Sequence, residues 1–179
     1  MNVAMAVIGN LPPILFLTFH NKFGISFSLL GLLVLLNFST QLLIDLIFSF
    51  FSHKFNIPMT VKLTPLISVF GLLIFVAWPT LFPSSAYIGL VIGTIIFSAS
   101  SGLAEVLLSA VIAALPSDNS ERDMSLLHSI YAWGAVGVVS LGSLFLLVFS
   151  SDLWQILTLI FALIPLTSFI LYQIGRAHV

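Results

Sequence analysis

One acidic residue, Glu105, lies in the middle of a long apolar stretch, residues 87–115. About 20 apolar residues in a helix, at a rise of about 1.5 Å each, cover the roughly 30 Å hydrocarbon core of a bilayer. A carboxylate at that depth is costly unless it is protonated, paired or facing water, so such acids tend to mark ion or solute pathways. Small residues recur around it at helical spacing: Ser98, Ser101, Gly102 and Ser109. We therefore expect Glu105 to face protein or water rather than lipid.

A second polar row follows the spacing i, i+4, i+8 in residues 28–50: Asn37, Gln41 and Asp45. These side chains share one face of a helix. Asn37 and Gln41 fit two roles equally, hydrogen bonds to neighbouring helices at about 1 kcal/mol each, or contact with a solute. Asp45 lies about two turns from the end of its segment, where it can reach water or a nearby lysine. We predict a gating or structural role for Asp45 and Lys54.

A third group lies in residues 124–134, where His128, Tyr131 and Trp133 follow a polar loop. A histidine can change its charge near neutral pH, and a buried one needs hydrogen bonds on both ring nitrogens. His128 therefore fits either a proton pathway or a packing role. Tyr131 is a candidate hydrogen-bonding partner of a solute, and Trp133 a candidate stacking surface for a sugar ring.

Asn10 precedes two prolines, Pro12 and Pro13, in the first apolar segment. Proline removes a backbone donor and clashes with the preceding turn, so we expect a bend just after Asn10. The carbonyls freed there need a neighbouring helix or a solute as partner. Asn10 joins the candidate solute contacts.

The composition is that of an integral membrane protein. Of the 179 residues, 60% are hydrophobic and 6% are charged, and the mean hydropathy is +1.23. The absence of cysteine excludes disulfides and thiol catalysis. The net charge of −1 and the lack of a basic run exclude nucleic acid as a partner. We expect no cofactor and no metal.

The chain reads as an all-α, polytopic protein with its polar residues clustered between apolar segments. The six segments that we predict are residues 3–19, 28–50, 65–81, 87–115, 127–149 and 153–172.

The positively charged residues predict the orientation. Four lie on one side of the predicted membrane, Lys54, Lys62, Arg122 and Arg176, and one on the other, Lys22. The positive-inside rule then places both termini in the cytoplasm, in a multi-pass protein of the cell membrane. Aromatic residues expected at the outer interface are Trp78, Tyr87 and Trp154.

Polar and apolar segments alternate with a period of three. The first, second, fourth and fifth carry the polar residues, whereas the third and sixth have no ionisable side chain within the span. This pattern suits a 3+3 inverted repeat in which the first two members line a cavity and the third faces lipid. The alternative is that the pattern arose by chance.

Three places resemble the N-terminal half of a major facilitator superfamily transporter, in the fucose-permease-like branch of sugar:proton symporters. They are Phe23 with Gly31, the run Gly102-Leu-Ala-Glu105, and the run from His128 to Gly134. The resemblance implies a proton-coupled carrier of a sugar, a role for Glu105 in sugar binding and proton coupling, and a second six-helix half.

The chain departs from the pattern of that branch in two segments. His128 and Tyr131 stand where fucose permeases carry Gln and Asn, and Pro12 and Pro13 stand where they carry an Asn-Asp pair. Of the superfamily's loop motif between the second and third helices, only the basic residue survives, as Lys54. These departures leave the identity of the solute open.

The last six residues, 174–179, read Ile-Gly-Arg-Ala-His-Val. They resemble the translation of a sequencing-library adapter, so we expect one native unit, residues 1–173, and a missing C-terminal half. The alternative is a genuine cytoplasmic end, since arginine commonly flanks a membrane helix.

The function predicted from these features is secondary active transport of a small polar solute by alternating access, coupled to protons at Glu105. A drug or metabolite efflux carrier of the same superfamily is the nearest alternative, followed by a six-helix channel or membrane subunit. A membrane-embedded enzyme ranks far behind these, because the sequence has no Gly-x-Ser-x-Gly or His-Glu-x-x-His motif and we expect Asp45 and Glu105 at different depths.

Overall fold

The computed structural model describes residues 1–114, 116 and 118–176, and within them it contains helices and no strands. The seven α-helices are α1 (Asn2–Ile14), α2 (Phe16–Phe23), α3 (Phe27–Phe51), α4 (Ile57–Leu81), α5 (Ala86–Ala114), α6 (Ser120–Phe149) and α7 (Trp154–Arg176). Short 3-10 turns precede three of them: η1 (Ser52–Lys54), η2 (Pro83–Ser85) and η3 (Ser151–Leu153). Five helices are long and apolar enough to cross a membrane, and α1 with α2 makes a sixth span if that bent pair counts as one. An all-helical membrane protein is therefore confirmed at this level.

The first segment is broken, but the break does not lie where the prolines predicted. α1 continues through Pro12 and Pro13, and the axis turns by 44° at Leu15 before α2 begins. The Leu15 N–H donates to the Pro12 carbonyl at 3.0 Å, three residues back, and the regular ladder resumes from Phe19 to Leu15 at 2.9 Å. The tightened turn thus follows the prolines instead of preceding them, and the expectation of a bend just after Asn10 is corrected.

Two helices begin earlier than the apolar pattern indicated, because polar residues cap and extend them. α4 begins at Ile57 rather than at residue 65, with the Asn56 side chain accepting from the Met59 N–H at 3.2 Å. α6 begins at Ser120, where the Asn119 side chain accepts from the Arg122 N–H at 2.9 Å. Such caps satisfy backbone donors that the helix itself leaves unpaired.

The closest helix contact joins α4 and α5 through glycines. A Cβ atom on Gly93 would lie 2.8 Å from the Phe75 Cβ and 2.9 Å from the Gly71 carbonyl oxygen. A Cβ atom on Gly71 would lie 2.6 Å from the Phe97 backbone nitrogen. The two glycines therefore allow the backbones to approach as small residues do in membrane helix pairs.

An aromatic cluster fills the core at the end of the bundle where α2 meets α7. Phe19 packs edge-on against Phe75, with ring centroids 5.6 Å apart, and against Trp154, at 5.1 Å. Trp154 is fully buried. The expectation of an interfacial Trp154 is therefore wrong, because α7 turns this ring inward against α2. At the same end, an ion pair of 3.4 Å joins Lys22 to Asp152.

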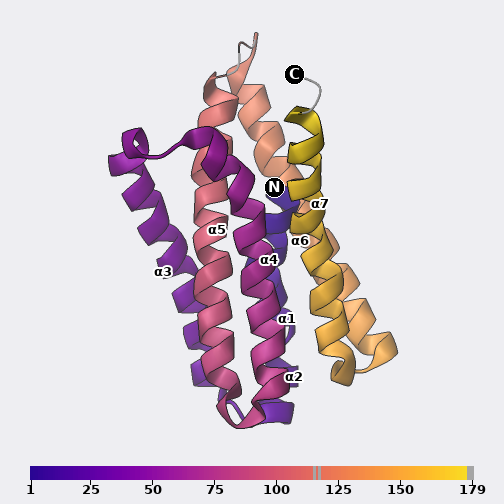
Figure 1. Cartoon of the computed structure of the whole chain (residues 1–179). Coiled ribbons are helices and arrows are strands. Elements are labelled where there is room, and N and C mark those ends of the chain that lie inside the picture. The colour runs from indigo at the N-terminus through magenta and orange to yellow at the C-terminus, as the bar shows by residue number, and fades with distance from the viewer. Residues whose placement is uncertain (115, 117, 177–179) are drawn as a thin grey trace.

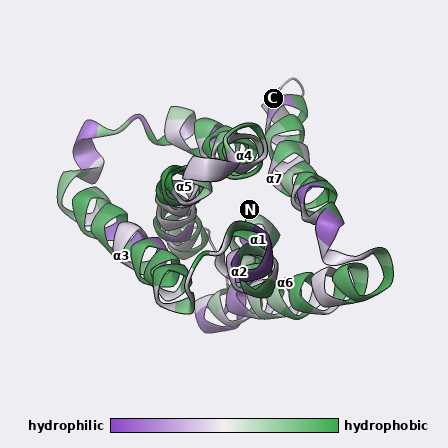
Figure 2. Ribbon diagram, turned by 90° about the horizontal axis from the view of Figure 1, so that it is seen from below, coloured by the Kyte–Doolittle hydropathy of each residue, from purple (hydrophilic) through white to green (hydrophobic). Residues whose placement is uncertain are grey.

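The helices are not equally enclosed (Figure 1). α4 packs against both α5 and α7, whereas α3 leans on α5, and α3 and α6 are the least buried of the long helices. Viewed along the bundle, α1 lies between α3 and α6 (Figure 2). The sequence pattern predicted that the third segment, now α4, faces lipid. Because α4 is packed on two sides, it is more enclosed than that prediction implies. The N-terminus and the end of α7 lie at the same end of the bundle, where the Tyr172 hydroxyl donates to the Met1 sulfur at 3.0 Å.

Candidate functional site: a cavity between four helices

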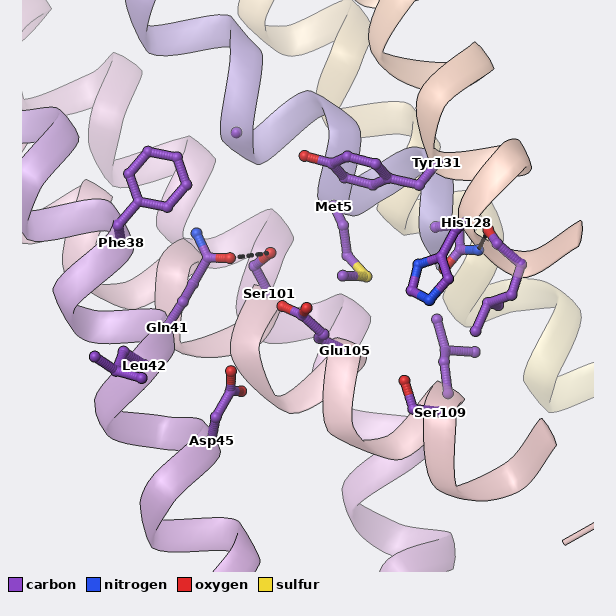
Figure 3. A pocket seen from close by; sticks show the side chains of 14 residues that line it. Met5, Phe38, Gln41, Leu42, Asp45, Ser101, Glu105, Ser109, His128 and Tyr131 are labelled. Carbon is purple, nitrogen blue, oxygen red and sulfur yellow. Dashed lines mark hydrogen bonds between the residues drawn. The ribbon is translucent and has the colours of Figure 1, made fainter. Parts of the chain in front are cut away.

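A cavity of about 500 Å³ opens between α1, α3, α5 and α6. Its walls are built by Asn2, Met5, Gly9, Phe38, Gln41, Leu42, Asp45, Ser101, Glu105, Leu108, Ser109, Leu127, His128 and Tyr131 (Figure 3). No described residue of α4 or α7 is among them. The four helices that carry polar residues in the sequence are thus the four that line the cavity. Its volume falls in the range of about 300–1,000 Å³ that is usual for small-molecule sites.

Glu105 lies on the α5 wall with its side chain exposed to the cavity (Figure 3). It is nine residues before the end of α5 at Ala114, which is about 14 Å along the axis at about 1.5 Å per residue. Ser101 and Ser109, one helical turn to either side, share its face and also line the cavity. Glu105 thus borders the space between the four helices, together with serine hydroxyls of its own helix.

Asp45 shares the cavity with Glu105, although the sequence suggested separate depths. α3 crosses α5 at Gly102, where an added Cβ would lie 3.2 Å from the Asp45 Oδ1. Asp45 Oδ1 is enclosed and has no hydrogen-bond partner among the described residues. Gly102 precedes Glu105 by three residues, so both acids border the same space (Figure 3). The close crossing at a glycine, which helical spacing alone does not reveal, brings them together.

The facing wall comes from α6 and the start of α1. His128 and Tyr131, one turn apart on α6, both line the cavity. A Cβ atom on Gly9 would lie 3.3 Å from the Tyr131 hydroxyl oxygen, so this glycine leaves room for the phenol. The Asn2 side chain donates to the Leu127 carbonyl at 2.6 Å and ties the two helices together beside the cavity.

Asn37 and Gln41, for which two roles were open, take different places. Asn37 is buried, and its Oδ1 accepts from Gln41 Nε2 at 2.8 Å and from Ser98 Oγ at 2.5 Å. Gln41 lines the cavity, and its Oε1 accepts from Ser101 Oγ at 3.3 Å. Asn37 therefore joins α3 to α5, while Gln41 is at once a link between helices and part of the cavity wall.

Replacing Asn37 with alanine should destabilise the bundle by about 1–2 kcal/mol, because Gln41 and Ser98 both lose their acceptor, at about 0.6–1 kcal/mol for each hydrogen bond in a membrane protein. Unfolding in mixed micelles, followed by circular dichroism, measures this loss. The matched control is Asn10→Ala, since the one hydrogen bond that the Asn10 side chain forms with a described residue lies within its own helix, to the Ala6 carbonyl at 2.8 Å. Equal losses in the two variants would contradict the role given to Asn37.

Besides the buried Asn37, three predicted site residues lie outside the cavity. The Asn10 amide turns back to Ala6. Trp133 is 76% exposed and borders a separate apolar groove between α1, α6 and α7. Lys54 lies in η1 with its ammonium 5.1 Å from the centre of the Phe51 ring. A solute in the cavity would therefore meet Gln41 and Tyr131, but not the Trp133 ring.

The cavity also contains residues that the sequence did not single out, notably Phe38 and Met5. Phe38 follows the spacing i, i+3, i+7 with Gln41 and Asp45, so the helical face already identified from the polar row includes it. No comparable signal marks Met5, which depends on how α1 is rotated within the bundle.

The charges on the cavity wall are unbalanced. Two carboxylates, Asp45 and Glu105, face it, and no lysine or arginine is among its described lining residues. His128 is the one lining side chain described that can become positively charged. No group of three or more His, Cys, Asp or Glu side chains suited to a metal is found among the described residues. The arrangement can bind and release protons and can donate hydrogen bonds from Tyr131, Gln41 and serine hydroxyls.

Comparisons with protein-family models, with curated proteins and with solved structures gave no match to this chain. The resemblance to major facilitator transporters therefore stays a prediction. The chemistry of the cavity is the basis for a functional conclusion.

Proposed function

We propose that the protein is a secondary active transporter that carries a small polar solute through this cavity, driven by protons. The observation that supports the proposal most is the position of Glu105 in a cavity lined by four helices. Three of these helices are long and apolar enough to cross a membrane, and the fourth, α1, is so together with α2. Ionisable residues inside membrane segments that face a cavity characteristically belong to ion or solute pathways.

Glu105 is the proposed proton carrier. When the cavity faces the proton-rich side, Glu105 takes up a proton, and in its neutral form it can donate a hydrogen bond to the solute. Gln41 and Tyr131 supply further hydrogen bonds from α3 and α6, on either side of Glu105 (Figure 3). Release of the proton on the opposite side restores the carboxylate and completes the cycle. His128 is a second proposed proton-binding group on the facing wall.

Alternating access needs a part of the protein that moves against this bundle. The low burial of α3 and α6, which flank the cavity, supports a partner packed on that side. We propose that this partner is a second six-helix half, as the resemblance to major facilitator transporters implies, and that the present chain is the N-terminal half. The DNA that continues the coding sequence beyond Gln173 tests this directly: six further apolar segments are expected, and a stop codon there would contradict it.

A flux experiment tests the proposed function. The full-length protein is reconstituted in vesicles, a pH gradient is imposed, and uptake of radiolabelled solutes is followed with and without a proton ionophore. Uptake above the equilibrium level that collapses with the ionophore is the expected result. Uptake that never exceeds equilibrium would indicate a channel and would contradict the proposal.

The apolar part of the wall favours a second candidate, efflux of an amphipathic solute. Met5, Phe38 and Leu42 face the cavity beside its polar groups, and Leu108 and Leu127 extend this surface. Such a wall binds solutes with an apolar body, as ligand sites lined mainly by hydrophobic side chains do. An efflux carrier exchanges its solute for protons that move in the opposite direction. In the same vesicles it would therefore accumulate solute when the interior, and not the exterior, is acidic.

A further inference from the structure

The charge of the cavity restricts which solutes it can hold. Asp45 and Glu105 both border it. If Glu105 carries a proton during transport, Asp45 still presents one negative charge, and if neither is protonated there are two. A negative charge in a largely apolar site is costly without a partner of opposite sign. An anionic solute would add to this cost, whereas a cationic solute would relieve it.

The positive side chains of the nearby segments do not supply that partner. Lys54 lies over the Phe51 ring outside the cavity, and Lys62 borders two separate grooves that include Pro58. Neither they nor Arg122 are among the lining residues. A positively charged His128 would balance one acid and leave the other. The Asp45 carboxylate lines the cavity and is the acceptor that such a ligand would meet, while its Oδ1 is enclosed and has no hydrogen-bond partner among the described residues.

Aromatic rings on two walls add a second, independent attraction for a cation. Phe38 on α3 and Tyr131 on α6 both line the cavity, on opposite sides of the space above Gln41 and Glu105 (Figure 3). The face of an aromatic ring attracts a cation within about 6 Å of its centre, and groups of such rings with acids are used to recognise ammonium ions. A sugar hydroxyl can donate a hydrogen bond to a carboxylate, but a neutral sugar leaves the net negative charge unbalanced.

We propose that the solute is a small organic cation, of the amine or ammonium class, held by Asp45 and by the rings of Phe38 and Tyr131. This inference rests on the proposed transport function and narrows its solute. In this proposal the two acids have different roles: Asp45 pairs with the positively charged group of the solute, and Glu105 binds and releases the proton. Asp45 thus becomes a binding residue, in place of the gating role that its position near a helix end had suggested.

Equilibrium binding to the full-length protein in detergent micelles tests the solute class. The probes are radiolabelled choline, galactose and galacturonate, which are a cation, a neutral sugar and the anion derived from that sugar. Choline is expected to bind at least about tenfold more tightly than galactose, a difference of about 1.4 kcal/mol, and galacturonate is expected not to bind. Galactose binding as tightly as choline, any preference for galacturonate, or no binding of choline would overturn the proposal.

Variants assign the binding to the named residues. Asp45→Asn should weaken choline binding at least about tenfold, as expected for loss of a charged partner, while Asp152→Asn, which removes an acid outside the cavity, should leave it unchanged. Phe38→Leu should weaken it about threefold, and the matched Phe50→Leu, at a 73% exposed position of the same helix, should not. Unchanged affinity in Asp45→Asn would overturn the proposal. The wild-type comparison of probes remains decisive if that variant fails to fold.

The two proposals fail in different ways. Proton-driven accumulation of galactose with no affinity for choline would refute the cation inference and leave the carrier intact. Choline binding that depends on Asp45, in a protein that never concentrates any solute, would refute the carrier and leave the cation site.

Discussion

Replacement of Glu105 with glutamine is expected to abolish proton-driven accumulation of the solute. A pH gradient of one unit corresponds to about 1.4 kcal/mol, which can concentrate a solute coupled to one proton about tenfold. Glutamine has nearly the same size and still forms hydrogen bonds, but it cannot carry a proton. The concentration ratio across the vesicle membrane should therefore fall from as much as about tenfold to about one. Exchange of labelled for unlabelled solute should persist, because the cavity is otherwise unchanged.

The matched control for this variant is Glu121→Gln. Glu121 is an exposed acid in the first turn of α6 and does not line the cavity. Its replacement should leave accumulation intact. Accumulation that survives in Glu105→Gln would assign proton coupling elsewhere, with His128 the next residue to replace.

Replacement of Gly93 with leucine should disrupt the contact between α4 and α5. Even the first side-chain atom would meet the Phe75 backbone nitrogen at 2.8 Å and the Gly71 carbonyl oxygen at 2.9 Å, and backbone atoms cannot move aside without separating the helices. Overpacking of a well-packed site costs about 1–3 kcal/mol and more where backbone is involved, so we expect a loss of about 3 kcal/mol or more. Unfolding in mixed micelles and the yield of monodisperse protein measure it.

Gly137 provides a control with the same substitution. It also lies in the middle of an apolar helix, but a Cβ atom there would meet no other atom within 4 Å. Gly137→Leu should not lower the free energy of unfolding, and the higher helix propensity of leucine favours the folded state by up to about 1 kcal/mol. Equal destabilisation by the two leucines would show that the effect comes from the helices themselves and not from their contact.

Much of the fold could be predicted from composition and periodicity. The apolar segments follow from bilayer thickness, and proline chemistry indicates a break in the first of them, although the break lies at Leu15 and not just after Asn10. The starts of α4 and α6 were predicted too late in the chain, because each helix begins with a capped polar turn that an apolar pattern does not register. The inverted repeat, the orientation in the membrane and the relation to major facilitator transporters stay predictions.

The candidate site was predicted in part. Glu105, His128, Gln41 and Tyr131 do meet around one cavity, since their helices carry the polar faces that a membrane protein turns away from lipid. Trp133 and Asn10 do not, although they lie close to those faces along the chain. A side chain on such a helix can bond to the backbone of its own helix, as Asn10 does, or point to the outside of the bundle, as Trp133 does. Spacing along the chain does not distinguish these side chains from those that line the cavity.

The sequence by itself determined that this is a helical membrane protein and that four of its segments carry polar side chains, because the bilayer requires long apolar helices and makes every ionisable group within them expensive. The tertiary structure decided which of those side chains share a space. Asp45 meets Glu105 because α3 crosses α5 closely at Gly102, and Trp154 is a core residue because α7 turns it against Phe19. Such relations depend on the rotation and crossing of whole helices, which are decided by contacts between residues far apart in the chain.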